Sequence, residues 1–340
     1  MKERVLAFDI LKIISIYLVV IIHICTIVFG NYNVQTVEWQ VLNAWDSIAH
    51  ISVPIFFMVS GALLLNDERS RSIDFVLKHR VINVVRIYIL WDIFYTIWSV
   101  VKWSIVEGFR MGFLKSAAVE FMKGHYHMWF LVALVGLYLL LPILKIIVDD
   151  VSIEKYFIFL CIGLCTIPTT IAGFHVIDQY FQIFNNLYLN FGYVTCFVLG
   201  HYLYRYYKTL SGFAFFCAGV GCWIFTMLLT RYLSEGAINS LFYDPLKLNI
   251  LIPSMAIFIV CIKIVDKYSS SINGNYIKNL EGYVLPIYLL HPIILETVQL
   301  TGKMCPISLI PFYAFLVCMV CIILSRFLLL IPGSKFFLKL

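Results

Sequence analysis

The first long apolar stretch of the chain, residues 5–29, constrains the fold most strongly. It is long enough to cross a bilayer, because a spanning helix needs about 20 predominantly apolar residues. Yet it contains Asp9, Lys12 and His23. An ionisable side chain inside a spanning helix costs about 2.5–3.5 kcal/mol on insertion scales, so such residues usually face a cavity or a partner. The stretch therefore predicts a membrane helix that carries functional residues.

These three polar side chains share one face of the predicted helix. Lys12 and His23 are close to three whole turns apart, which places them on one face and roughly 16 Å apart along the axis. Asp9 precedes Lys12 by about one turn on nearly the same face. Taken singly, Asp9 and Lys12 could form an ion pair in the headgroup region, and His23 could be a hydrogen-bonded histidine between helices. The alignment of all three favours a functional stripe.

Further apolar stretches of similar length follow along the chain. We predict about ten spanning helices, near residues 8–29, 47–65, 81–103, 127–148, 156–174, 187–205, 211–231, 246–265, 282–301 and 308–331. A chain with 62% hydrophobic and only 13% charged residues is not an ordinary soluble domain. The expected fold is all-α and polytopic, a bundle of about ten transmembrane helices that forms a single domain over residues 1–340.

Lysine and arginine are unevenly distributed between the predicted loops, and this indicates the orientation of the helices. The loop after the second span carries four such residues between positions 69 and 80, whereas the first loop, residues 30–46, carries none. The third loop breaks the trend with three cations between positions 110 and 123. The majority places both termini in the cytoplasm. The net charge of +6 is then explained by loops that face an anionic membrane surface, so we expect no nucleic-acid partner.

The ten cysteines indicate little chemistry, because nearly all of them lie inside apolar segments. Cys318 and Cys321 form a C-x-x-C pattern in the middle of a lipid-type helix. Small apolar side chains that fill space explain them better than redox or metal chemistry does. No zinc-type spacing occurs, so we predict no metal site.

The predicted orientation sorts the remaining polar residues into two groups. Cations lie toward the cytoplasmic end, namely Lys12, Arg80 and Arg86. Histidines and carboxylates lie deeper and further outward, namely His23, Asp92, His127, His291 and Glu296.

The two groups suit different parts of one reaction. Arginine offers paired donors to phosphate and lysine adds a point charge, so the inner group suits a phosphorylated ligand, although loop cations also satisfy the positive-inside rule. An imidazole can remove the proton of an acceptor hydroxyl as a general base, so the outer group suits acyl transfer. Coenzyme A, with a phosphate head and a thin arm, fits a separation of roughly 15–20 Å between the groups.

Five stretches of the chain carry a family resemblance. They are FDILKIISIYLVVIIH (8–23), VPIFFMVSGALLL (53–65), RVINVVRIYILW (80–91), HMWFLVALVGLYLLLPIL (127–144) and PIYLLHP (286–292). Their order along the chain, and the end of the predicted span at which each one lies, both match the pattern of one known family. In these stretches the chain resembles the acyltransferase-3 family of bacterial integral-membrane acyltransferases over essentially its whole length.

The resemblance implies that His23 is the catalytic imidazole. In the family pattern an arginine precedes this histidine with ten residues between them; here Lys12 keeps the charge but lacks the bidentate fork. The family's Arg-x-x-Arg near the third helix becomes Arg80-x-x-Asn83, and Arg86, one turn further on, is a candidate substitute. The cations Lys12, Arg80 and Arg86 are therefore expected to bind the acyl-CoA.

The resemblance also implies residues that line the active site. His127 and Trp129 match the family's His-x-Trp, although Trp129 could be an interfacial anchor alone. Ser60 matches a Ser-Gly pair, for which close packing of small residues is the alternative explanation. His291 matches a His-Pro pair, for which the alternative is a histidine that binds a carbonyl freed by Pro292.

The resemblance implies transfer of an acyl group, commonly acetyl, from acyl-CoA to a hydroxyl of a cell-envelope glycan or lipid-linked sugar. The setting would be the bacterial cytoplasmic membrane, without a fused extracellular domain, with Asp9 orienting or neutralising Lys12. One alternative is an exopolysaccharide exporter or flippase that performs no chemistry. Another is an N-acyltransferase, in which Glu296 or Asp46 recognises the ammonium form of the acceptor.

Overall fold

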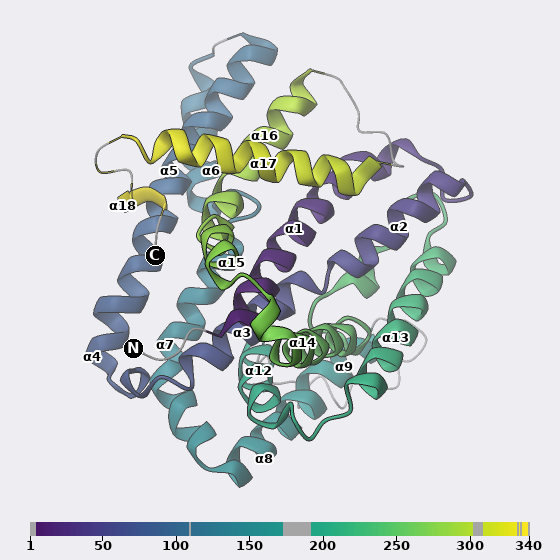
Figure 1. The fold of residues 1–340 in the computed structure, drawn as a ribbon. Helices are drawn as coiled ribbons and strands as arrows, with labels where there is room; N and C mark the ends of the chain where they lie inside the picture. Colours follow the sequence, from purple (N-terminus) through teal and green to yellow (C-terminus); the bar gives the residue numbers. More distant parts are fainter. Residues whose placement is uncertain are drawn as a thin grey trace. The chain divides into compact units, whose positions relative to one another are not determined.

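The computed structural model describes residues 5–108, 110–172, 192–301, 309–331, 333 and 335–338. Every regular element in this part of the chain is a helix, as the sequence predicts (Figure 1). The helices group into two compact units, and each unit is described by itself. The first unit comprises Met1–Asp67 and Ile147–Leu324, and the second comprises Glu68–Ile146 and Ser325–Leu340. The single domain expected over residues 1–340 stays a prediction.

The first unit is built around its first helix, α1 (Leu6–Val28). The other α-helices of this unit are α2 (Val37–Ala49), α3 (Ser52–Leu64), α8 (Val151–Cys161), α9 (Ile167–Ala172), α12 (Val194–Tyr206), α13 (Gly212–Leu233), α14 (Leu248–Tyr268), α15 (Gly274–Glu281), α16 (Val284–Leu300) and α17 (Ile310–Leu328), which belongs to it up to Leu324. Helix α1 packs against α2, α3, α14, α15 and α16. Its side chains Leu11, Val20 and Ile21 are fully buried, so α1 is the central helix of this unit.

The second unit contains a long helix with a π-helical turn near its beginning. Its α-helices are α4 (Ile73–Val76), α5 (Ile82–Glu107), α6 (Gly112–Lys123), α7 (Trp129–Asp149), of which the residues up to Ile146 belong here, and the short α18 (Lys335–Leu338). The π-helical turn Leu77–Val81 joins α4 to α5 and contains Arg80. Helix α18 packs on α5, where Trp91 Nε1 donates to the carbonyl of Phe337 at 2.8 Å.

The predicted membrane spans are largely confirmed. Eight segments among the described residues are long and apolar enough to cross a membrane, and α15 with α16, bent by 46°, makes a ninth. These nine correspond to nine of the ten predicted spans. The tenth, near 187–205, and the end of the one near 156–174 extend outside the described residues; α12 is the described part of the former. The chain is therefore an all-α, polytopic protein.

Helices α3 and α12 approach each other more closely than side chains would allow. A Cβ atom on Gly61 would overlap the backbone carbonyl of Phe197, and one on Gly200 would overlap that of Met58. Such close approach through small residues strengthens van der Waals packing between membrane helices. This explains the glycine of the Ser-Gly pair by packing, and Ser60 lies beside it, half-buried on α3.

Candidate functional site

Helix α1 runs parallel to α15 and α16, and two side-chain contacts define the pairing. Near the start of α1, Lys12 Nζ lies 2.8 Å from Glu281 Oε1. Further along, the ring centroids of His23 and His291 are 5.0 Å apart. Because the spacing is similar along both segments, the two contacts form two polar levels, separated by roughly 16 Å along α1. The structure thus brings together two predicted site residues, His23 and His291.

The environment of His291 determines which of its ring nitrogens carries the proton in the neutral form. The residue is fully buried, and its Nδ1 lies 3.0 Å from the carbonyl oxygen of Ile287. Because a carbonyl can only accept, Nδ1 donates and Nε2 is the acceptor nitrogen of the neutral ring. The carbonyl that Pro292 deprives of its usual amide is that of Tyr288, so the bond observed here is to a different carbonyl. His23 beside it is half-buried.

Lys12 has a partner that sequence reasoning missed. Its ammonium and the Glu281 carboxylate form an ion pair in which both side chains keep about a quarter of their exposure. The two residues are 269 positions apart in the chain, so no local pattern could have indicated the contact. Asp9, which we expected to orient or neutralise Lys12, is buried on α1. A ligand phosphate at Lys12 would compete with Glu281.

The second unit has a histidine pair of its own. The Nδ1 atoms of His125 and His127 lie 2.9 Å apart, so in the neutral pair one donates and the other accepts. The Tyr95 ring stacks on His125 at 4.2 Å and presents its edge to His127 at 4.8 Å. Asp92 Oδ1 accepts the backbone N–H of His125 at 3.2 Å. All four residues are buried, and Tyr95 was absent from the sequence hypothesis.

A glycine sets the direction in which the chain enters this histidine pair. Gly124 adopts φ +74°, which L-residues rarely adopt, between the end of α6 and His125. A Cβ atom there would also lie 2.7 Å from the Tyr88 hydroxyl. The turn therefore requires a glycine at this position.

The two predicted arginines of the second unit lie over aromatic rings. The guanidinium carbon of Arg80 is 5.7 Å from the centroid of Phe75, and that of Arg86 is 4.3 Å from the centroid of Phe336 on α18. Arg69 also lies over Phe75, at 5.0 Å. These are distances at which a cation is attracted to a ring face. The aromatic partners hold the guanidinium groups without neutralising their charge.

Two further predicted site residues, Trp129 and Glu296, lie on helices α7 and α16. Trp129 is the first residue of α7 and is 43% exposed, which agrees with the alternative of an interfacial anchor. Glu296 is buried on α16, beyond His291. Among the described residues there is no group of three or more His, Cys, Asp or Glu that could hold a metal ion.

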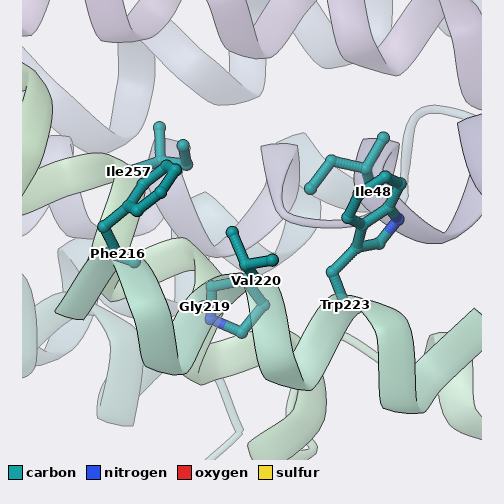
Figure 2. A pocket seen from close by; sticks show the side chains of 8 residues that line it. Ile48, Phe216, Gly219, Val220, Trp223 and Ile257 are labelled. Carbon is teal, nitrogen blue, oxygen red and sulfur yellow. The ribbon is translucent and has the colours of Figure 1, made fainter. Parts of the chain in front are cut away.

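The first unit also has an apolar cavity of about 50 Å³. Figure 2 shows side chains that line it. Its walls are apolar side chains of α2, α13 and α14, with Phe216, Val220 and Trp223 on α13. None of the predicted site residues lines it. Since α13 exposes most of its apolar side chains, the cavity suits contact with lipid hydrocarbon.

The fold and the polar levels define a class first: a polytopic helical membrane protein with ionisable residues inside its helices. The comparison with protein families goes further, since the model of an acyltransferase domain, that of the acyltransferase-3 family, matches residues 5–326. The chain therefore belongs to the acyltransferase-3 family and is a membrane acyltransferase. No curated protein and no solved structure matches it.

Proposed function

We propose that the protein transfers an acyl group, commonly acetyl, from acyl-CoA to a hydroxyl of a cell-envelope glycan or lipid-linked sugar. The observation that carries this proposal is the pair of polar levels along α1. Lys12 lies at one level and the His23–His291 pair at the other, roughly 16 Å away along the helix axis. A donor whose phosphates bind at the first level would place its thioester near the second through a thin arm.

The reaction needs a base at the second level. In the proposed step His23 takes the proton of the acceptor hydroxyl, and the oxygen attacks the carbonyl carbon of the thioester. The carbon–sulfur bond breaks, and the imidazolium returns the proton to the thiolate, which leaves an ester and free coenzyme A. General-base catalysis of this kind contributes about 10²- to 10⁴-fold.

His291 supports this base in the proposal. Its Nδ1 is occupied by the Ile287 carbonyl, so its Nε2 offers an acceptor within the pair. A neighbouring acceptor nitrogen favours the protonated form of His23 during proton transfer. His291 is thus a positioning residue for His23.

The donor end is proposed to recognise phosphate by charge. Lys12 supplies an ammonium group that is still partly exposed, and binding of phosphate would loosen its ion pair with Glu281. Asp9 would limit the charge at this end of α1. For the second unit we keep the proposal that Arg80 and Arg86 bind donor phosphate and that Asp92 and His127 line a site.

The setting is proposed to be the bacterial cytoplasmic membrane, with both termini in the cytoplasm, where acyl-CoA is made. Acetyl-CoA would be the donor and the envelope glycan the acceptor, with membrane lipid surrounding the helices. The nine candidate spans and the family support a membrane location.

The test uses purified protein in detergent, radiolabelled acetyl-CoA and crude envelope glycan. Wild type should move label into glycan, and His23→Ala should lower that transfer at least 100-fold. The matched control is His79→Ala, which removes an exposed histidine of the second unit and should leave transfer unchanged. Equal transfer by wild type and His23→Ala would overturn the mechanism. A folded wild type that neither binds acetyl-CoA nor transfers label would favour an exporter.

A further inference from the structure

The span Val37–Leu64 is interrupted by a break that carries two ionisable residues. Helix α2 ends at Ala49, His50 and Ile51 form the break, and α3 begins at Ser52. Asp46 lies in the last turn of α2. This span is the most buried of the candidate spans in the described residues. Ionisable residues at such a position usually serve a function, because the membrane interior penalises charge.

The Asp46 carboxylate is enclosed but poorly compensated. The residue is only 4% exposed, and its Oδ1 has no hydrogen-bond partner among the described residues. His50 Nε2 lies 3.6 Å from this oxygen, which is beyond hydrogen-bond distance. Burying a carboxylate without full pairing costs several kcal/mol, roughly. If this position served packing alone, an amide or an apolar side chain would be less costly to bury.

Two polar residues close to Asp46, Asn43 and Tyr243, do have hydrogen-bond partners. The Tyr243 hydroxyl donates to Asn43 Oδ1 at 2.6 Å, and Asn43 Nδ2 donates to the carbonyl of Met227 at 2.8 Å. The His50 ring stacks on Tyr243 with centroids 4.8 Å apart. This network fixes His50 on one side of the carboxylate. Asp46 Oδ1 is therefore the acceptor that the surrounding network leaves for a ligand.

The apolar side of α2 is closed in a different way. Trp223, whose ring lines the cavity in Figure 2, donates Nε1 to Ser47 Oγ at 3.0 Å. Ile48 lines the same cavity, whereas Asp46 and His50 do not. The cavity and the Asp46–His50 pair thus use different faces of α2.

The helix rise along α1 and α2 indicates a similar level for Asp46 and His23. Helices α1 and α2 are joined by a short connection and pack against each other, with the rings of Phe29 and Trp39 5.6 Å apart near the connection. Counted from there, Asp46 is about 10 Å along α2 and His23 is about 9 Å back along α1, at 1.5 Å per residue. A group that reacts at His23 could therefore place a neighbouring substituent at Asp46.

We propose that Asp46 and His50 form an acceptor subsite, which binds an O–H or N–H donor of the acceptor while its reacting hydroxyl lies at His23. This inference rests on the proposed function. A carboxylate accepts strongly from a sugar hydroxyl and from an ammonium group alike. The subsite would hold the acceptor and takes no part in breaking the thioester.

The closing experiment measures glycan dependence of transfer for Asp46→Asn, which keeps the size of the side chain and removes its charge. The apparent KM for crude envelope glycan should rise at least tenfold, while binding of radiolabelled acetyl-CoA stays within twofold of wild type. The melting temperature in detergent should stay equal or rise, because a buried charge has been removed. Glu235→Gln, an exposed carboxylate just beyond α13, is the matched control and should match wild type in all three measurements.

A second arm of the experiment distinguishes a hydroxyl from an ammonium group as the acceptor group bound at Asp46. The same glycan is tested after its amines have been chemically acetylated. If the Asp46→Asn effect persists on this material, the subsite binds a hydroxyl; if it disappears, the subsite binds an ammonium group. His50→Gln provides a second variant and should raise the same KM.

Three results would overturn the inference or its basis. An unchanged glycan KM in both Asp46→Asn and His50→Gln removes the subsite. If the melting temperature of Asp46→Asn falls by several degrees and its transfer rate is equally low at saturating glycan, Asp46 has only a packing role. Failure of the wild type to bind acetyl-CoA overturns the proposed function itself, and is distinguishable because it does not depend on the variants.

Discussion

Each unit contains a pair of histidines, and the two pairs are built differently. His125 and His127 are neighbours in sequence, both buried, and linked Nδ1 to Nδ1 at 2.9 Å. His23 and His291 come from helices far apart in the chain, have ring centroids 5.0 Å apart, and include one half-buried member. In the His125–His127 pair each Nδ1 atom is the hydrogen-bond partner of the other. In the second pair the buried imidazole is fixed by a carbonyl, which suits proton transfer at its neighbour.

After the loss expected for His23→Ala, the largest expected effect concerns His291. His291→Leu replaces the imidazole by an apolar side chain of similar size in a buried place, so the fold should be retained. Without the acceptor nitrogen beside His23, kcat for transfer should fall about 10- to 100-fold, a part of what a general base contributes. The KM for acetyl-CoA should not change. Steady-state kinetics with labelled acetyl-CoA and envelope glycan measure both quantities.

The control for His291→Leu is its pH profile together with its melting temperature. A positioning role moves the acidic limb of the kcat profile, because the protonation of His23 changes. A melting temperature that falls with kcat, and a pH profile of unchanged shape, would mean that His291 only packs α16. That outcome would remove the distinction between the two pairs.

The second expected effect is on stability and belongs to the other pair. His125→Leu deprives His127 of its Nδ1 partner and leaves a buried polar group to be compensated, which costs about 1–3 kcal/mol of unfolding free energy. The matched variant is His79→Leu, at an exposed position, which should change stability little. Thermal unfolding in detergent compares the two. Equal melting temperatures would show that the His125–His127 contact does not stabilise the second unit.

Some features of the fold and the candidate site could be predicted from the sequence, and others could not. The spans were predictable because long apolar runs are dictated by the bilayer. The functional stripe along α1 was predictable because Lys12 and His23 lie on one regular helix. Glu281 was not predictable, because its contact joins segments 269 positions apart and depends on how α15 packs on α1.

The break between α2 and α3 was missed for a related reason. The predicted span began at residue 47, whereas the helical segment begins at Val37. The middle and last turns of α2 contain the polar residues Asn43 and Asp46, which are typical of a loop in a membrane protein. In the structure both are buried, and Asn43 bonds to the Met227 carbonyl and to Tyr243. Tertiary packing made these polar positions helical and internal.

A smaller effect tests whether the other distant pair of the first unit competes with ligand. Glu281→Gln weakens the ion pair with Lys12, in which both side chains are partly exposed. Such a pair is worth at most about 1 kcal/mol, so the Kd for acetyl-CoA should fall by about two- to fivefold. Equilibrium binding of labelled acetyl-CoA measures this, with Glu235→Gln as the control. A weaker binding would mean that Glu281 holds Lys12 in the position that the phosphate needs.

The smallest effect concerns a local ion cluster of the second unit. Glu68 lies between Lys145 Nζ at 3.0 Å and Arg71 Nε at 3.2 Å. The hydrogen bond from Lys145 and its charge, with a lesser part from Arg71, lower the pKa of Glu68 below its ordinary value of 4.5. Its contribution to stability is therefore fully present above pH 4.5 and is lost as the pH falls through the lowered pKa.

Glu68→Gln should remove this acid-dependent part of the stability. Because the Glu68 side chain is largely exposed, the effect should be small and should decrease further at high salt. Melting curves at pH 7 and pH 4, in low and high salt, compare the variant with wild type. The control is Asp74→Asn, which disrupts an exposed pair with Lys78 within one helical segment. If both variants flatten the pH dependence equally, the Lys145–Glu68 contact adds nothing beyond what an exposed local ion pair supplies.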